Sequence, residues 1–599
     1  MSAIGRAPYR SHPLSANIFF RSVRDSNIVI ECLMHCHLTR ETSPASTFLP
    51  GVSTMPHIRA WLRGILLAVF SFATTLPVWS DDALHTRIDA LIETKAATAP
   101  AELCTDAEFL RRIYLDLNGT IPTAQEARKF IQDKATDKRE KLVERLLQQP
   151  RYGQRMREMF HVMLMERRGD NDEWTKFLKS SFENNKPWDQ LVREILNPDA
   201  ENEQTRGAAF FITKRLEKYG QNPVDLPGLT RDVGRLFLGI DVQCAQCHDH
   251  LFINDYKQAD YQGLFAYVGH TFIRRDKKFP AVGEKLMKTK IEFQSVFGGE
   301  KTQIGPRIPG GEEVAIPVVK KGEEYTKPPD RKTQFPGIPK FSPLAELSKR
   351  LPATSNKRFA TNIANRLWFV MMGRGIVHPL DLHHGDNPAS YPELLDLLGQ
   401  QIIAHKFDVQ WMLREIALSR TYQRSSLLPP NSDHVPESSF LVAIEKPLSA
   451  EQLLSGTLQA TGEDKHLTAN AKQKPDDADG TDRLSDYRNR FLAAFANNPR
   501  EPEVEFSPSV KAALFVLNDV DVLAWLQPKP GNLVERLSKM ADSKQIAEEL
   551  YLSVLTRFPT EEETAEVNRH LERNVKTRQQ AIGQLAWALL ASTEFCVNH

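Results

Sequence analysis

The spacing of apolar residues changes twice along this chain of 599 residues, and this change limits the fold more than any other feature. Before residue 274 and after residue 343, apolar side chains recur three and four positions apart, as in amphipathic helices. Between them the chain is rich in Lys, Gly and Pro, with short apolar runs at 291–297 and 314–319. We therefore expect a mainly α protein: two helical domains joined at 275–340 by a small β-containing, Gly/Pro-rich connector.

Capping residues mark helix ends in the first half. Residues 109–117 have a helical period that should stop at Gly119. Thr123, with Glu126 three positions later, forms the pattern of a capping box at the start of another helix. A further apolar stripe should end at Pro150.

Similar signals recur in the second half. Residues 359–369 are amphipathic and precede Gly373, which is typical of a helix C-cap. Thr560 and Glu563 have the spacing of another capping box, and 582–589 should form a final helix. Between these, 462–482 is a polar loop with no apolar period.

The segment Cys244-Ala245-Gln246-Cys247-His248 has the C-x-x-C-H pattern by which haem c is attached. Two thiols form thioethers with the haem, and the following histidine is an axial iron ligand. Only six cysteines occur in the chain, so the pattern is rarely met by chance. It predicts haem c bound by Cys244 and Cys247, with His248 as the metal ligand.

Two other chemistries fit the same residues. Cys244 and Cys247 can form a disulfide, or they can bind zinc together with His248 and His250. A thioredoxin-type site needs a βαβ context, whereas the residues before Cys244 have a helical period. Zinc sites usually need a second ligand pair, and the other cysteines after the expected signal, Cys104 and Cys596, are isolated in the sequence.

A haem would also need an apolar pocket. The apolar residues near the segment that could line one are Leu236, Phe237, Phe252, Leu264 and Phe265.

An export signal is expected at 55–80. Met55 opens a short basic region, 64–79 is mostly apolar, and Val78 and Ser80 are the small residues expected before a cleavage site at Asp81. We expect an exported protein of the periplasm or cell envelope. Residues 1–54 have no sustained periodicity, and we interpret them as a mis-assigned start or a disordered segment.

The overall charge excludes one class of partner. Lys plus Arg total 77 and Asp plus Glu total 76, so no electrostatic field attracts nucleic acid. The chain after the signal is longer than one core usually covers. We expect one helical domain at 81–274, which contains the C-x-x-C-H segment, and another at 341–599.

Several of these segments resemble one family. The chain resembles the paired-domain proteins of planctomycetes, in which a cytochrome-C-like domain of the PSCyt type precedes a domain of the PSD type. The resemblance covers nearly all of the chain after the signal. It depends on the residues at 109–117, 150–153, 239–250, 365–368, 373–379 and 419–426.

The resemblance implies an exported protein of unknown function whose gene often lies beside that of a sulfatase-like protein, a possible partner. Relatives commonly have His where this chain has Met159, and thioether sulfur and imidazole can both serve as the sixth iron ligand. Met159 is therefore a candidate cofactor-binding residue, ahead of His161 and His270. Relatives also have a Cys-x-Cys element near 503–505 that this chain lacks.

Three functions remain open. The first is a haem protein that exchanges electrons with a redox partner. The second is a non-redox binding or scaffold protein of the envelope with a Cys244–Cys247 disulfide, and the third is a zinc-dependent hydrolase. His383 and His384 offer a faint metal or acid–base signal in the second half, although a solvated loop is the more common role of such a pair. No catalytic residue is assigned.

Overall fold

The computed structural model describes residues 82–218, 224–430, 432–465, 467, 483–500, 515 and 518–599. The expected signal at 55–80, the segment 1–54, residues 503–505 and most of the polar loop at 462–482 lie outside the described residues. Within the described ranges, no helix is both long enough and apolar enough to cross a membrane.

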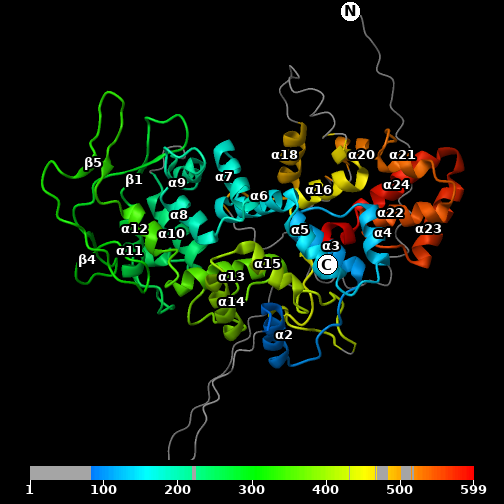
Figure 1. Ribbon diagram of the computed structural model, residues 1–599, viewed down its shortest axis with the longest axis horizontal. Helices are drawn as coiled ribbons and strands as arrows, with labels where there is room; N and C mark the ends of the chain where they lie inside the picture. Colours follow the sequence, from blue (N-terminus) through cyan, green and yellow to red (C-terminus); the bar gives the residue numbers. More distant parts are fainter. Residues whose placement is uncertain are drawn as a thin grey trace, which may run out of the picture. The chain divides into compact units, whose positions relative to one another are not determined.

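Helices form most of the first half (Figure 1). The Thr123 hydroxyl accepts a hydrogen bond from the Glu126 amide at 3.2 Å, and the Glu126 carboxylate accepts one from the Thr123 amide at 2.9 Å, which confirms the capping box. Gly119 ends the preceding helix with a φ of 67°, in the region that favours glycine. The elements are α2 (Leu84–Thr94), α3 (Asp106–Asn118), α4 (Ala124–Gln132), α5 (Lys138–Leu147), α6 (Pro150–Met165), α7 (Asp172–Glu183), α8 (Trp188–Leu196), η2 (Arg206–Ala209), α9 (Phe210–Leu216), α10 (Leu226–Leu238), η3 (Cys244–Gln246) and α11 (Gln258–Val268).

Pro150 has a different role from the one expected. Helix α5 ends at Leu147, and Pro150 is the first residue of α6. Proline is favourable there because a first-turn N–H has no helical partner and the ring already fixes φ near the helical value. The same proline therefore separates two helices by starting the second.

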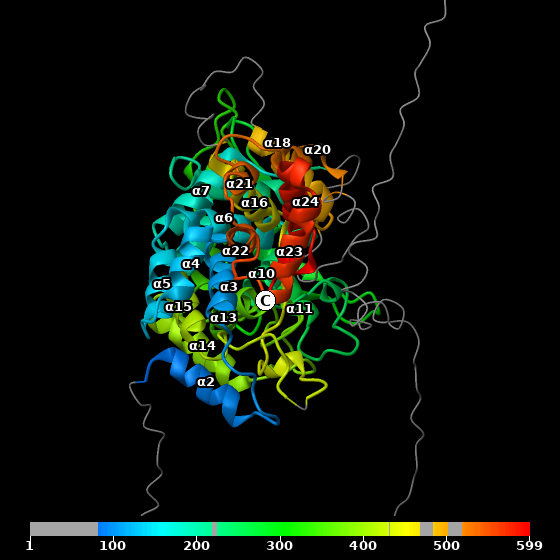
Figure 2. The ribbon, with the colours of Figure 1, turned by 90° about the vertical axis from the view of Figure 1, so that its right-hand side faces the viewer.

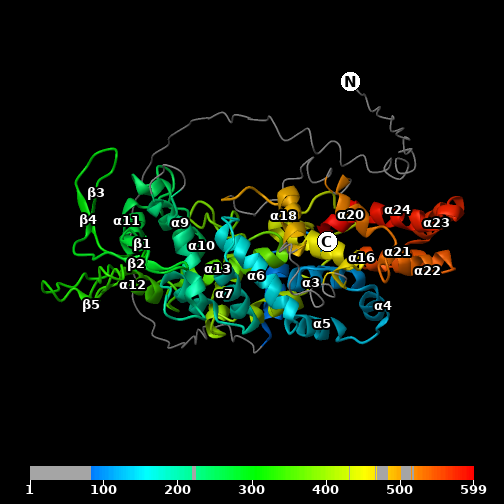
Figure 3. The ribbon, with the colours of Figure 1, turned by 90° about the horizontal axis from the view of Figure 1, so that it is seen from above.

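The connector consists of short hairpins, as predicted (Figure 3). They lie on the side of α11 and α12, and β3 and β4 contact α11. The apolar run at 314–319 is not a strand; 291–293 pairs instead with 302–304. The antiparallel pairs are β1 (Thr271–Ile273) with β2 (Val282–Glu284), β3 (Ile291–Phe293) with β4 (Thr302–Ile304), and β5 (Tyr325–Lys327) with β6 (Ile338–Pro339).

The second half is again helical. Gly373 ends α13 with a φ of 82°, and Thr560 and Glu563 form the expected capping box. The elements are α12 (Pro343–Arg350), α13 (Lys357–Met372), α14 (Pro392–Ala404), α15 (Val409–Leu418), η4 (Glu437–Ser439), β7 (Lys446–Pro447), α16 (Ala450–Thr461), α18 (Arg483–Phe495), α20 (Val520–Trp525), α21 (Leu533–Ser538), α22 (Ser543–Val554), α23 (Glu561–Arg573), η5 (Val575–Thr577), α24 (Arg578–Leu590), α25 (Thr593–Cys596) and β8 (Val597–Asn598).

The apolar cores do not follow the division of the sequence into halves. One core joins the helices of the first half to α12–α15, and the other joins α16–α25 to Leu115 and Ile121 of the first half. Figure 2 shows α2, from the start of the described chain, beside α14 and α15. The two halves therefore share their buried apolar surface.

Helices α10 and α13 meet where the halves join. The Asn362 side-chain amide donates to the Leu236 carbonyl at 2.8 Å, and Arg366 donates to the Arg235 carbonyl at 2.8 Å. Both carbonyls belong to the last turn of α10, where helical partners run out; the Arg235 carbonyl also accepts a hydrogen bond from the Gly239 amide at 3.2 Å. Side chains of α13 thus complete the C-terminal end of the helix that leads into the C-x-x-C-H segment.

Candidate functional site

The C-x-x-C-H segment lies on the surface just after α10. Gly239 ends α10 with a φ of 70°, and the Asp241 carboxylate accepts a hydrogen bond from the Gln243 amide at 3.0 Å before the short helix η3 begins. Cys244 and Cys247 are exposed, and both thiols are free. The segment therefore presents two accessible thiols one turn apart.

Neighbouring elements hold the backbone of the segment. The Gln246 carbonyl accepts hydrogen bonds from the side chains of Gln258 and Gln262, at 3.3 and 3.0 Å. The Cys247 carbonyl accepts one from the Val296 amide, beyond β3, at 3.0 Å. Helix α11 and the β3–β4 hairpin therefore fix the positions from which the two cysteines project.

His248 has one ring nitrogen engaged with the backbone. Its Nδ1 lies 2.6 Å from the Asp249 carbonyl oxygen, and a carbonyl oxygen only accepts hydrogen bonds. Nδ1 must therefore carry the proton, which leaves the Nε2 lone pair available for a metal. A backbone carbonyl commonly orients a metal-binding histidine in this way.

His250 has the opposite arrangement. Its Nδ1 accepts hydrogen bonds from the amides of Phe252 and Ile253, at 3.2 and 2.9 Å, so it closes a turn of the backbone. Among the described residues, no three His, Cys, Asp or Glu side chains are grouped so that they could hold a metal ion.

Apolar side chains near the segment are exposed to solvent. Phe252 is 83% exposed and Phe297 is 71% exposed, and the Phe297 ring lies 4.8 Å from that of His248. Leu251 and Val296, next to them in sequence, are also exposed. Exposed apolar groups gathered on one surface usually mark a place where another apolar group binds.

The expected apolar pocket does not form from the five residues named for it. Leu236, Phe237 and Leu264 are buried in the core, and Phe265 packs against that core, whereas Phe252 points to solvent. The helical period of α10 directs its apolar face inward, away from the segment that follows it.

Met159 lies elsewhere. It lines a cavity of about 440 Å³ between α6, α10 and α13, whose lining includes neither cysteine of the segment nor His248. Met156, one helical turn before it, is fully buried in the core. The structure therefore does not place Met159 in a common cavity with the C-x-x-C-H residues.

His161 and His270, the other candidate ligands, have buried surroundings. The Trp174 indole donates to the His161 Nδ1 at 3.0 Å, and burial lowers the pKa of His161. Burial also lowers the pKa of His270, and nearby Lys285 adds to this effect.

His250 and the pair His383 and His384 are far apart in the sequence but lie close together in space. The His383 amide donates to the Gly239 carbonyl at 2.9 Å, so the loop that holds this pair lies against the end of α10. The Tyr256 ring lies between His250, at 6.0 Å, and His384, at 5.4 Å. His383 and His384 are half-buried, so the expected solvated loop is only partly correct.

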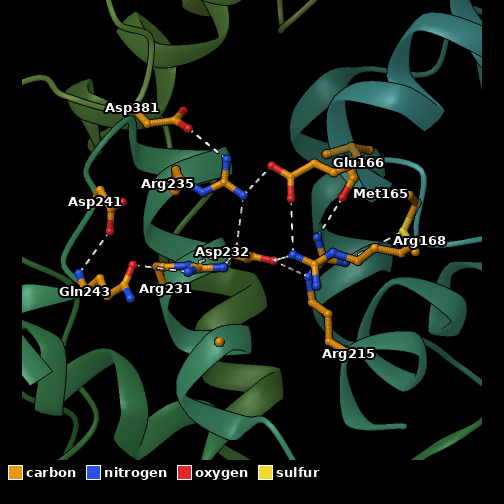
Figure 4. A network of polar contacts seen from close by, with 12 residues as sticks. Met165, Glu166, Arg168, Arg215, Arg231, Asp232, Arg235, Asp241, Gln243 and Asp381 are labelled. Carbon is orange, nitrogen blue, oxygen red and sulfur yellow. Dashed lines mark hydrogen bonds and ion pairs between the residues drawn. The ribbon is translucent and has the colours of Figure 1, made fainter. Parts of the chain in front are cut away.

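A buried set of charged residues surrounds Asp232 of α10, the helix that leads into the segment (Figure 4). The Asp232 carboxylate accepts hydrogen bonds from Arg215 at 2.7 Å and from Arg168 and Arg235 at 3.1 Å. Burial alone would raise the pKa of the Asp232 carboxyl, but the arginines, above all Arg215 and Arg235, hold it well below its ordinary value.

This set also joins the halves of the chain. Arg235 binds Glu166 at 2.5 Å and Asp381 at 2.8 Å, and Arg366 of α13 binds Asp381 at 2.5 Å. Sequence reasoning missed these partners, because ion pairs between distant residues leave no local pattern. We call the set the buried charge network; it comprises Glu166, Arg168, Arg215, Asp232, Arg235, Arg366 and Asp381.

Comparison with known proteins identifies both halves. Residues 87–272 match the family PSCyt2, described as a protein of unknown function (DUF1549), and this range includes the C-x-x-C-H segment. Residues 345–571 match PSD1, also described as a protein of unknown function (DUF1553). No curated protein and no solved structure matches the chain. The chain therefore belongs to the paired-domain proteins in which a PSCyt2 domain precedes a PSD1 domain, both of unknown function.

Proposed function

We propose that this protein is an exported haem protein, in which Cys244 and Cys247 bind haem c covalently and His248 is an axial iron ligand. The chemistry that haem supplies is the exchange of single electrons. The protein would then carry electrons to or from a redox partner in the periplasm or cell envelope. A sulfatase-like protein encoded nearby remains a possible partner, by family resemblance alone.

The hydrogen bond from His248 Nδ1 to the Asp249 carbonyl is the observation that carries this proposal. It sets the tautomer in which Nε2 is the free nitrogen, the arrangement that iron requires. A histidine with only a structural role does not need that nitrogen free. His250, two residues later, uses its Nδ1 as an acceptor and so differs from its neighbour.

The surroundings of the thiols fit the attachment reaction. Cys244 and Cys247 would each add across a haem vinyl group, with the thiol proton passing to the other vinyl carbon as the C–S bond forms, so no oxidant would be needed. Cys244 and Cys247 are exposed and therefore accessible to an attachment machinery. The exposed side chains of Phe252 and Phe297 could then cover part of an apolar ring system.

Surface attachment also suits electron exchange. The segment lies at the surface rather than in the core, so a haem held there keeps an edge near solvent. A redox partner would dock on the surface formed by residues 251–252 and the β3–β4 hairpin, where Leu251, Phe252, Val296 and Phe297 are already exposed.

The test is expression of the full chain with a cytochrome c maturation system, followed by acid extraction and a pyridine haemochrome assay. Thioether-bound haem stays with the polypeptide, whereas non-covalent haem is extracted. We expect retained haem in the wild type, its loss in the Cys244→Ser/Cys247→Ser variant, and retention in Cys104→Ser, whose buried thiol lies outside the segment.

Three results would overturn the proposal. One is the absence of Soret absorption in protein purified from its native envelope. A second is an intact mass that is two hydrogen atoms below that of the reduced chain, which would instead support the scaffold function with a Cys244–Cys247 disulfide. Zinc bound through the same cysteines would support the hydrolase.

A further inference from the structure

The cavity between the two family-matched segments has the size and position of a ligand site. Its volume is about 440 Å³, within the range of small-molecule sites, which often lie where domains meet. Helices α6 and α10 of the first half form one side, and α13 with residues 444–452 of the second half forms the other. This cavity is separate from the C-x-x-C-H segment.

Most charged groups at its wall are already paired. The Lys446 ammonium lies 2.7 Å from Asp116, and Glu451 lies 2.9 Å from Arg167. Arg155, on α6, differs: it makes no hydrogen bond or ion pair with any described residue, and its Nε is buried. A buried guanidinium nitrogen without a partner costs free energy unless something else binds it.

The unpartnered Arg155, and not the overall charge of the wall, favours an anion. Seven carboxylates and five cations line the cavity, and the four members of the buried charge network among them, Glu166, Arg235, Arg366 and Asp381, pair with one another and cancel in charge. Burial lowers the pKa of the Lys446 ammonium; Asp116 opposes this, while Arg112 and Arg155 add to it. Arg155 therefore lies near the Lys446 ammonium as well as near Glu451. An oxyanion that enters the cavity would reduce the repulsion between the two cations.

A hydrogen-bond acceptor is also unpartnered at the wall. Asn598 is 2% exposed, and its side-chain nitrogen donates to Asp116 at 2.8 Å. Its Oδ1 has no hydrogen-bond partner among the described residues. A ligand hydroxyl would satisfy this oxygen, whereas a second anionic group would not.

We propose that this cavity binds a small hydroxylated oxyanion, either a carboxylate or a phosphate ester, whose charged group contacts Arg155 and whose hydroxyl donates to Asn598. Arginine suits both kinds of oxyanion because its planar group donates two parallel hydrogen bonds. Phe369 and Ile444 provide apolar walls for the carbon chain between these groups. The site uses residues of both halves, so neither half alone would form it.

The test is ligand-observed NMR and calorimetry on the full exported chain with three probes. Gluconate carries a carboxylate and hydroxyls, glucose 6-phosphate carries a phosphate and hydroxyls, and sorbitol carries hydroxyls alone. We expect at least one of the two anions to bind about tenfold or more tightly than sorbitol, and the stronger anion identifies the oxyanion.

Matched variants locate the binding. Arg155→Met should weaken the stronger anion about tenfold or more, Arg155→Lys should retain part of the affinity, and Arg151→Met, on the same helix but outside the cavity lining, should leave it unchanged. Equal binding of sorbitol, unchanged binding in a folded Arg155→Met protein, or no binding of any probe would each overturn the proposal.

The haem proposal and the anion proposal can be contradicted independently of each other. The Cys244→Ser/Cys247→Ser variant should bind the anion with wild-type affinity, because neither cysteine lines the cavity. Loss of anion binding in that variant would contradict the separation of the two sites.

Discussion

Arg215 Nε and Asp232 Oδ2 lie 2.7 Å apart, and both side chains are only 1% exposed. Removing the carboxylate charge leaves buried arginines without their shared partner. We expect Asp232→Asn to lower the free energy of unfolding by about 3–5 kcal/mol, measured by urea denaturation. Asp137→Asn removes a surface partner of Lys141 and should cause no measurable change. Similar stabilities for the two variants would show that the buried charge network contributes little.

From the lowered pKa of the Asp232 carboxyl we can predict how the free energy of unfolding depends on pH. The folded state holds the pKa of Asp232 below its ordinary value of about 4, so the unfolded chain takes up this proton first as the pH falls. The stabilisation is therefore complete above the ordinary pKa and decreases below it. Urea unfolding between about pH 5 and pH 3 should show a smaller loss in Asp232→Asn than in the wild type. An equal loss would assign the acid sensitivity to other groups.

Gly119 ends α3 in a left-handed conformation and also leaves space for the side chain of Arg155. Its φ is 67°, and an added Cβ would lie 2.9 Å from the Cδ of Arg155. Gly119→Ala should cost about 1–2 kcal/mol from the backbone conformation alone, and more because Arg155 must move. Gly310→Ala is the control, since its φ is 74° and no atom lies within 4 Å of the added Cβ. Thermal unfolding should show a larger effect at Gly119, and anion binding should weaken only there.

The spectrum of the haem-loaded protein should distinguish His248 from Met159. His248→Ala removes the nitrogen that is free to bind iron, so it should shift the Soret band and leave the thioethers intact. Met159→Ala should leave the band unchanged, because Met159 lines the other cavity. A spectral change in Met159→Ala would restore Met159 as the sixth ligand.

Local patterns were sufficient to predict the helices and several of their ends. The capping boxes at Thr123 and Thr560 and the glycines at 119 and 373 form as expected, because each depends on residues within a few positions of one another. The apolar run at 314–319 could not be assigned from its composition. Whether a short apolar segment becomes a strand depends on a distant partner.

The candidate site was only partly predictable, because some of its contacts join residues that are far apart in the sequence. The C-x-x-C-H residues are contiguous, so their pattern is visible in the sequence. The approach of His384 to Tyr256 and the pairing of Arg235 with Asp381 each join residues more than a hundred positions apart. The outward position of Phe252 also depends on the turn that His250 closes, which periodicity does not predict.

The shared cores have a consequence for how such proteins evolve. The first core includes residues from Leu84 to Val268 together with residues from Leu344 to Leu441, so neither matched segment could be inherited alone without exposing an apolar face. A recombination break in the connector would separate two surfaces that are buried only against each other. The pair, rather than either segment, is therefore the unit that selection can retain, and changes on α10 and α13 should accumulate together.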